Sequence, residues 1–240
     1  MTTGRRGRGI LGHDQQALLN VLHYLNRKYN YRKLASLVGV SVSTLSRYST
    51  GKTIPRGVKA KTLFEKASSL INYEEIVEEF FGESLDIENG IYISHDIETI
   101  KLLSTYLLRQ FIGSRVDSVL ALDLQAIPIA TYFASLVNTE LYFVDDRPLW
   151  RDGIQVTYRS SSGDGRSSIW IPKGAARRRL STILVATTIL SHSPTKEILK
   201  TLQEKKVHVS GLFALVSKSS IWSTLSVPQG CRKVLVKLYT

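Results

Sequence analysis

Hydroxyl-bearing residues gather in the last third of the chain, directly after a run of apolar residues. Residues 183–195 read Ile-Leu-Val-Ala-Thr-Thr-Ile-Leu-Ser-His-Ser-Pro-Thr, an apolar strand pattern that leads into the expected start of a helix. Backbone N–H groups at a helix N-terminus bind phosphate, and hydroxyl or imidazole side chains nearby can add hydrogen bonds. The segment therefore predicts a site for a phosphorylated small molecule. Its predicted ligand-binding residues are Thr187, Thr188, Ser191, His192, Ser193 and Thr195.

A second segment with recognisable chemistry lies near the N-terminus, over residues 31–55. Apolar side chains at helical spacing predict a first helix over 31–38, and Gly39 allows the tight turn that follows. Ser41 is placed to cap a second helix over 42–49. The outward face of the second helix would enter a DNA major groove. That face consists of Val42, Ser43, Ser46 and Arg47.

Residues 31–55 resemble the helix-turn-helix of phage repressors, including the Ser-Thr-Gly-Lys-Thr-Ile-Pro continuation after the second helix. The resemblance implies base reading by Val42, Ser43 and Arg47, since Arg47 can pair with a guanine edge and valine methyls suit thymine. It implies phosphate contacts by Arg32, Lys52, Thr53 and Arg56, so that the predicted double-stranded DNA interface comprises Arg32, Ser41, Val42, Ser43, Ser46, Arg47, Lys52, Thr53 and Arg56. The alternative is a three-helix packing unit that contacts another protein. The local excess of Lys and Arg favours DNA.

Residues 95–240 resemble the type I phosphoribosyltransferases at three landmarks that occur in the family's order. Residues 119–130 are similar to the pyrophosphate loop, in which a strand turns into a helix that begins Ile-Pro. Residues 145–168 match the hood loop by position. Residues 183–195 lie on the signature for phosphoribosyl diphosphate, which has two adjacent acids followed by a Thr- and Gly-rich turn. The resemblance implies a ligand that carries a phosphorylated ribose.

The chain departs from this signature at the residues that matter most for chemistry. Thr187 and Thr188 replace the two acids, and Ser193 and Pro194 replace two glycines. Neutral hydroxyls cannot stabilise a cationic sugar, and the sequence shows no nearby acid that would substitute. We therefore predict no catalytic residues and no enzymatic activity, and we predict neither a cofactor nor a metal site. For His192 a second interpretation stays open, an exposed loop imidazole that contacts no ligand.

The elements that must position these residues follow from the hydrophobic pattern. Helices are predicted over 14–29, 31–38, 42–49, 57–70, 72–81, 96–112, 128–137 and 195–205, and strands over 117–122, 140–144, 168–171, 183–187, 207–216 and 234–238. Strands that alternate with helices predict an α/β fold with a parallel, Rossmann-like sheet, preceded by an all-α domain. The predicted organisation is a flexible basic arm (1–12), a helix-turn-helix domain (13–70), an acidic linker helix (71–94) and a phosphoribosyltransferase-like domain (95–240). The polar stretch 159–168 is predicted to be a mobile loop.

Charge and composition narrow the class of protein. The chain of 240 residues has a net charge of +12, and its first 70 residues hold thirteen Lys or Arg against two acids. Such a distribution favours a polyanionic partner. A single cysteine, Cys231, excludes an internal disulfide, and no apolar run is long enough to span a membrane, so we expect a cytoplasmic protein.

These features together resemble regulators of archaea and bacteria in which a DNA-binding head precedes a phosphoribosyltransferase-like body. The resemblance implies a homodimer that binds a palindromic operator, with recognition helices about 34 Å apart, and that senses a phosphorylated metabolite or nucleotide. Two alternatives stay open. One is an active phosphoribosyltransferase with an accessory DNA-binding domain, and the other is an architectural nucleic-acid binder that ignores small molecules.

Overall fold

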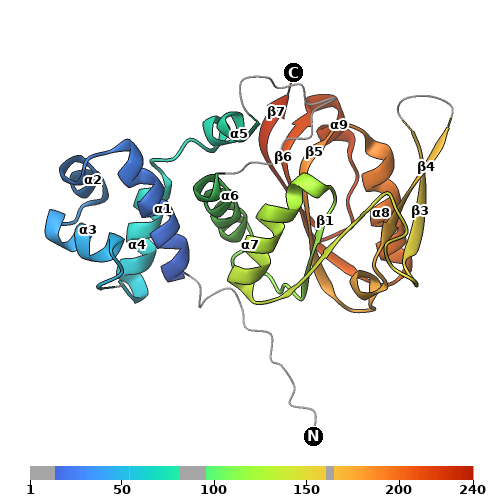
Figure 1. The fold of residues 1–240 in the computed structure, drawn as a ribbon, viewed down its shortest axis with the longest axis horizontal. Helices are drawn as coiled ribbons and strands as arrows, with labels where there is room; N and C mark the ends of the chain where they lie inside the picture. Colours follow the sequence, from blue (N-terminus) through green and yellow to red (C-terminus); the bar gives the residue numbers. More distant parts are fainter. Residues whose placement is uncertain (1–13, 54, 82–95, 161–164, 240) are drawn as a thin grey trace, which may run out of the picture.

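The computed structural model describes residues 14–53, 55–81, 96–160 and 165–239. Helices make up the N-terminal third, and a parallel sheet with flanking helices makes up the rest (Figure 1). The predicted basic arm and residues 82–94 of the predicted linker lie outside the described ranges. Within those ranges, no helix has both the length and the apolar character needed to cross a membrane.

Five helices form the N-terminal third: α1 (Asp14–Lys28), α2 (Tyr31–Val38), α3 (Val42–Ser49), α4 (Gly57–Ser68) and α5 (Tyr73–Phe81). Local capping explains the boundaries of α2 and α3. The Asn30 side chain accepts a hydrogen bond from the N–H of Lys33 at 2.9 Å, and Gly39 ends α2 in the left-handed region at φ 76°. Ser41 caps α3 by accepting from the N–H of Thr44 at 3.2 Å. The short loop between the caps fixes the angle between the two helices.

The central sheet is parallel, as the alternating pattern predicted, and its five strands have the order β2-β1-β5-β6-β7. Its strands are β1 (Ser118–Ala121), β2 (Glu140–Phe143), β5 (Ser181–Ile189), β6 (His208–Lys218) and β7 (Arg232–Tyr239). Helices α6 (Ile97–Gln110) and α7 (Ile127–Val137) cover one face, and α8 (His192–Glu204) covers the other. Both faces are therefore buried, which is why β5 is buried along nearly its whole length and contains the apolar run 183–186. Short η2 (Leu124–Ala126), η3 (Lys173–Ala176) and α9 (Ser219–Thr224) complete the fold.

The largest difference from the expected elements is a hairpin next to α8. The antiparallel strands β3 (Ile154–Arg159) and β4 (Arg166–Ile171) lie where the sequence predicted a long loop with one short strand. The loop prediction is wrong for residues 166–168, which belong to β4. Alternate residues of the two strands, Val156 and Ile169 among them, are buried against α8 and the sheet. The Ser- and Arg-rich composition of the other face concealed this period-2 pattern.

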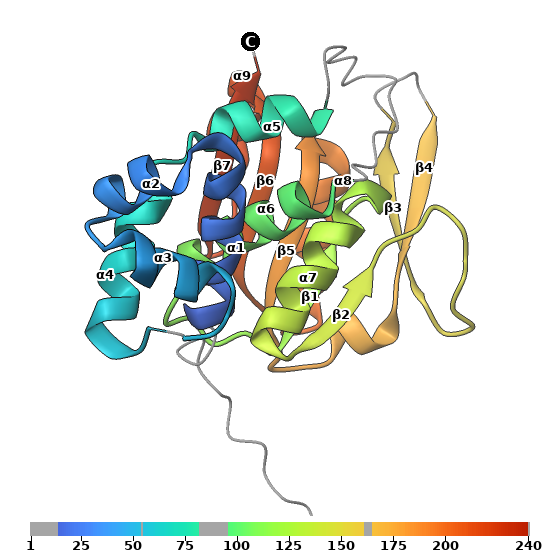
Figure 2. The same cartoon turned by 60° about the vertical axis from the view of Figure 1, so that its left-hand side comes forward.

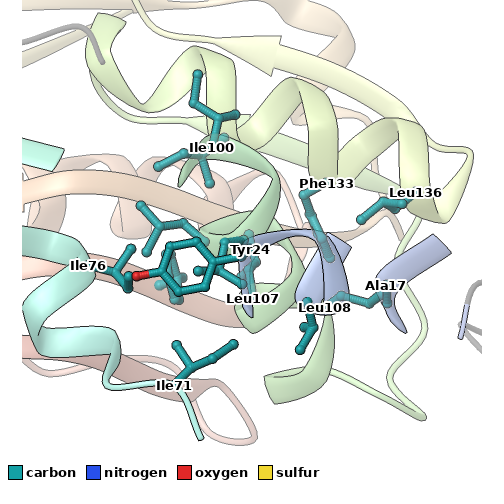
Figure 3. Packing of buried hydrophobic residues seen from close by; sticks show 14 of the residues in the cluster. Ala17, Tyr24, Ile71, Ile76, Ile100, Leu107, Leu108, Phe133 and Leu136 are labelled. Carbon is teal, nitrogen blue, oxygen red and sulfur yellow. The ribbon is translucent and has the colours of Figure 1, made fainter. Parts of the chain in front are cut away.

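Helix α1 joins the N-terminal helices to the sheet through one continuous hydrophobic core. Figure 3 shows Ala17 and Tyr24 of α1 in the same cluster as Leu107 and Leu108 of α6. The buried Asn20 of α1 adds side-chain hydrogen bonds of 3.1 Å to α6 and α7, through the hydroxyls of Thr105 and Tyr132.

Helix α5 makes a second connection between the two parts of the chain, because it packs on β7 and α6 (Figure 2). Glu78 of α5 also accepts a hydrogen bond from Lys237 of β7. The helical part is thus packed onto one side of the sheet rather than standing apart from it.

Candidate functional site

A cavity of about 280 Å³ opens at the carboxyl ends of β1 and β5. The N-terminus of α8 forms one wall, and Tyr158 and Ile169 of the β3–β4 hairpin form another. Ligands of open α/β sheets bind at this edge, where the strands end and the loops begin. The lining is mostly apolar, with a few polar groups from Asp123, Thr188, Ser191 and Thr195. Such a cavity suits a flat apolar group attached to a polar or anionic one.

The N-terminus of α8 provides the anion-binding part of the cavity. Ser191 caps the helix by accepting a hydrogen bond from the N–H of Ser193 at 3.3 Å. No acidic residue occupies the first turn of this 13-residue helix, so its positive end is not neutralised locally. Pro194 has no N–H and removes one donor from the turn. The remaining N–H groups and the hydroxyl of Thr195 face a region in which a phosphate would be stabilised.

Asp123 lines the cavity, and it belongs to the segment 119–130 that the sequence interpretation likened to the pyrophosphate loop. It follows β1, yet its carboxylate reaches the end of β5, where it accepts hydrogen bonds from the N–H of Thr187 at 2.8 Å and the hydroxyl of Thr187 at 2.7 Å. The N–H of Ala126 donates a further bond of 2.8 Å. Burial raises the pKa of Asp123, against these hydrogen bonds, which lower it. A carboxyl group therefore stands beside the two threonines that replace the expected acids.

The structure brings three of the six predicted ligand-binding residues to the cavity. Thr188, Ser191 and Thr195 line it, as the strand-to-helix turn requires. The other three, Thr187, His192 and Ser193, have partners outside the cavity.

Thr187 is fully buried and gives its hydroxyl to Asp123, because its side chain points to the neighbouring strand β1 instead of the cavity. The direction of a side chain alternates along a strand, so only one of two adjacent threonines can face the ligand. The alternation could have been predicted from the sequence. The partner of Thr187, Asp123 in the segment after β1, could not.

His192 and Ser193 are held by neighbouring elements. Nε2 of His192 lies 3.0 Å from the carbonyl oxygen of Ile221 and 2.7 Å from the hydroxyl of Thr224, both in α9. The hydroxyl of Ser193 accepts a hydrogen bond from the N–H of Arg159 at 3.1 Å, which attaches the hairpin to α8. Neither of the two interpretations of His192 anticipated this contact, since α9 lies almost thirty residues further along the chain.

The residues predicted to contact DNA lie on α2, on α3, at the cap of α3 and in the segment after α3. Val42 keeps 43% of its surface exposed although it is apolar. Ser46 is half-buried, while the hydroxyl of Ser41 is used in the cap. The N–H of Thr53 donates to the carbonyl oxygen of Arg47 at 3.2 Å, so the following segment folds back on α3. The predicted residues that are exposed are Arg32, Ser41, Val42, Ser43, Arg47, Lys52, Thr53 and Arg56.

Contacts to α1 fix the position of α3. Nε2 of His23 lies 2.9 Å from the carbonyl oxygen of Ser49, and the amide of Asn26 donates to the hydroxyl of Ser49 at 2.9 Å. Leu45 is fully buried on the inner side. The exposed face of α3 is therefore presented on a rigid support.

Comparison with known proteins identifies relatives of the fold. No protein-family model matches the chain, and no curated protein matches it. Solved structures do match. Adenine phosphoribosyltransferase from Rhodothermus marinus has a TM-score of 0.58 and 13% identity, over 70% of this chain and 98% of that one. The enzyme from Thermoanaerobacter pseudethanolicus has a TM-score of 0.58 and 14% identity, over 69% and 99%. The Saccharomyces cerevisiae enzyme, solved with an imino-altritol bisphosphate and adenine, has a TM-score of 0.52 and 13% identity, over 70% and 97%.

These similarities establish a phosphoribosyltransferase-like α/β fold for the part of the chain that contains the sheet. They also correct one expectation. The prediction that the chain is not an enzyme, based on Thr187 and Thr188, is contradicted because the solved structures that it resembles are those of enzymes. The prediction considered only residues close to Thr187 and Thr188 in the sequence, whereas the carboxylate of Asp123 reaches Thr187 from the segment after β1.

Proposed function

We propose that this chain is a phosphoribosyltransferase with an accessory DNA-binding domain. The observation that carries the proposal is that its sheet and flanking helices match almost the whole length of adenine phosphoribosyltransferases, 98% and 99% of two of them. The cavity supports it, because apolar residues, a helix N-terminus and one carboxylate line the same cavity. Adenine is therefore the first acceptor base to test.

Each part of the cavity has a role in this reaction. The N-terminus of α8 and Thr195 hold the 5′-phosphate of the donor, and Tyr158 and Ile169 enclose the base. The bond between the ribose and the diphosphate breaks, pyrophosphate leaves with the electron pair, and a ring nitrogen of the base forms the new bond and gives its proton to solvent. Asp123 stabilises the positive charge that develops on the sugar.

The test is the release of pyrophosphate by the full chain with phosphoribosyl diphosphate, magnesium and adenine. We expect pyrophosphate and a nucleotide product in equal amounts, and no release when the base is omitted. Absence of turnover with adenine and with a panel of other nucleobases would contradict the proposal.

The accessory function rests on a separate observation, the exposed face of α3. Val42, Ser43 and Arg47 project from a capped helix that α1 supports, and basic residues flank it on both sides. This arrangement supports a helix-turn-helix that reads double-stranded DNA as a dimer on a palindromic operator. A regulator of this kind would couple gene expression to the ligand of the cavity.

Replacing Arg47 by alanine should weaken specific DNA binding about 10- to 100-fold, because a bidentate contact to guanine contributes about 1–3 kcal/mol of discrimination. The measurement is an electrophoretic mobility shift with DNA from the protein's own promoter region. Lys200→Ala is the matched control, since it removes the same charge from an exposed position of α8. Equal binding by wild type and Arg47→Ala, or equal losses in the two variants, would show that α3 does not read DNA.

A further inference from the structure

A second cavity lies at the opposite edge of the sheet, where β5, β6 and β7 begin. Its volume is about 650 Å³, more than twice that of the cavity at the carboxyl edge. Five basic side chains line it: Arg115, Arg179, Lys206, His208 and Arg232. They come from four separate loops or strand starts, which the parallel topology brings to one edge.

The positive charge of this amino-edge cavity is largely uncompensated. Arg115 pairs with Asp117 at 3.0 Å, and Asp117 also accepts a hydrogen bond from the N–H of Ser181. Arg232 donates only to neutral oxygens of Gln110. Among the residues that the structure describes, no acidic side chain forms an ion pair with Arg179, Lys206 or Arg232. Four permanent cations thus face one carboxylate.

The backbone at two of these cations adopts a conformation that glycine would take more easily. Arg179 has a φ of 67° and Lys206 a φ of 60°, and the N–H of Arg179 donates to the carbonyl oxygen of Lys206 at 3.0 Å. Residues other than glycine in this region have a conformational cost. Two hydrogen-bonded residues in the left-handed region therefore place long cationic side chains in the lining of one cavity. Glycine at either position would have the lower conformational cost.

Size and chemistry indicate the class of ligand. The volume lies within the range of small-molecule sites, about 300–1,000 Å³. Arginine and lysine are the side chains that bind phosphate oxygens best, and no Phe, Tyr or Trp is among the described lining residues that could stack on a base. A concave site also suits a compact anion better than the extended backbone of DNA.

We propose that the amino-edge cavity binds an oligophosphate group, either free or as the phosphate chain of a nucleotide. This site is separate from the cavity at the carboxyl edge and does not depend on the reaction proposed there. Arg179 and Lys206 are its principal ligands, and Arg232 and Arg115 complete the shell.

The test is calorimetric titration of the full chain with inorganic tripolyphosphate, comparing wild type with the double variant Arg179→Gly/Lys206→Gly. Glycine accepts both positive φ angles, so the fold is retained and thermal stability should stay equal or increase. We expect affinity for tripolyphosphate to fall about tenfold or more, because two charge-assisted contacts are lost. Titration with ATP then distinguishes a free oligophosphate from a nucleotide.

A control variant separates this site from general electrostatic attraction. Lys61→Ala/Lys200→Ala removes the same charge from exposed positions on α4 and α8 and should bind tripolyphosphate as wild type does. Equal affinity in wild type and the glycine variant would overturn the proposal, as would equal losses in both double variants. Loss of duplex DNA binding in the glycine variant, with tripolyphosphate binding unchanged, would assign the surface to DNA instead.

Discussion

Asp123→Ala is expected to lower the release of pyrophosphate by about 100-fold or more, the usual effect of removing one group that stabilises charge in a transition state. The carboxylate of Asp123 is the acidic group that lines the cavity, and the threonines beside it carry no charge. The measurement is kcat and KM for phosphoribosyl diphosphate with the base held at saturation. A loss confined to KM would contradict a role in stabilising the transition state.

The pH dependence of the rate gives an independent check on Asp123. Burial raises its pKa, so the carboxyl loses its proton at a higher pH than an ordinary aspartate does. If the charged form is required, the rate should rise as the pH increases through this raised pKa. The rise should be absent in Asp123→Asn, and wild-type behaviour of that variant would show that the charge is not used.

Stability must be followed in parallel, because Asp123 also holds Thr187. Removing the carboxylate leaves the buried N–H of Thr187 without its acceptor, at a cost of about 1–3 kcal/mol, whereas the hydroxyl of Thr187 keeps the side-chain oxygen of Gln125 at 3.2 Å. Asp152→Ala is the matched control, since Asp152 is exposed and, among the described residues, its ion-pair partner is the exposed Lys173. Its activity and stability should equal those of wild type.

Gly211→Ala is expected to lower the free energy of unfolding by about 2–3 kcal/mol. Gly211 lies within β6, and a Cβ atom there would overlap the ring of Phe111, which is fully buried. The clash is with a rigid aromatic ring in a closed core, so it cannot be relieved by a side chain that turns into solvent. The measurement is chemical denaturation, with ΔG of unfolding from the midpoint and slope.

A second-site change tests the mechanism of this loss. Phe111→Leu removes the part of the ring that the methyl of Gly211→Ala would meet. The double variant should therefore lose less free energy of unfolding than the sum of the losses in the two single variants. Gly165→Ala is the control, since no atom of the described residues lies within 4 Å of its Cβ position, and its stability should change by about 0.5 kcal/mol at most. Strictly additive losses at positions 111 and 211 would contradict the proposed clash.

Local patterns predicted the elements well, and pairings between distant residues were not predictable. The apolar run at 183–187 identified β5 because both faces of a central parallel strand are buried. The bonds between Asp123 and Thr187 join residues 64 positions apart, and nothing in either local sequence specifies the other. The hairpin formed by β3 and β4 was missed because its outer face resembles a loop in composition.

The same distinction explains which site residues were predicted. Thr188, Ser191 and Thr195 belong to one continuous strand-to-helix turn, whose geometry is local. His192 belongs to the same turn, but its side chain contacts α9. The position of α9 depends on the path of β6, which precedes it. Thr187 illustrates the strand alternation, which turns adjacent residues to opposite faces.

The shared core around α1 has a consequence for how this chain can be divided or recombined. Removal of the chain before α6 would expose Leu107 and Leu108 to solvent. It would also remove Asn20, which donates hydrogen bonds to the hydroxyls of Thr105 and Tyr132. The part of the chain that contains the sheet would then expose a hydrophobic patch to water and would be prone to aggregate. The N-terminal helices therefore cannot be removed as an independent unit. A fusion protein that exchanges them must supply another helix in the position of α1.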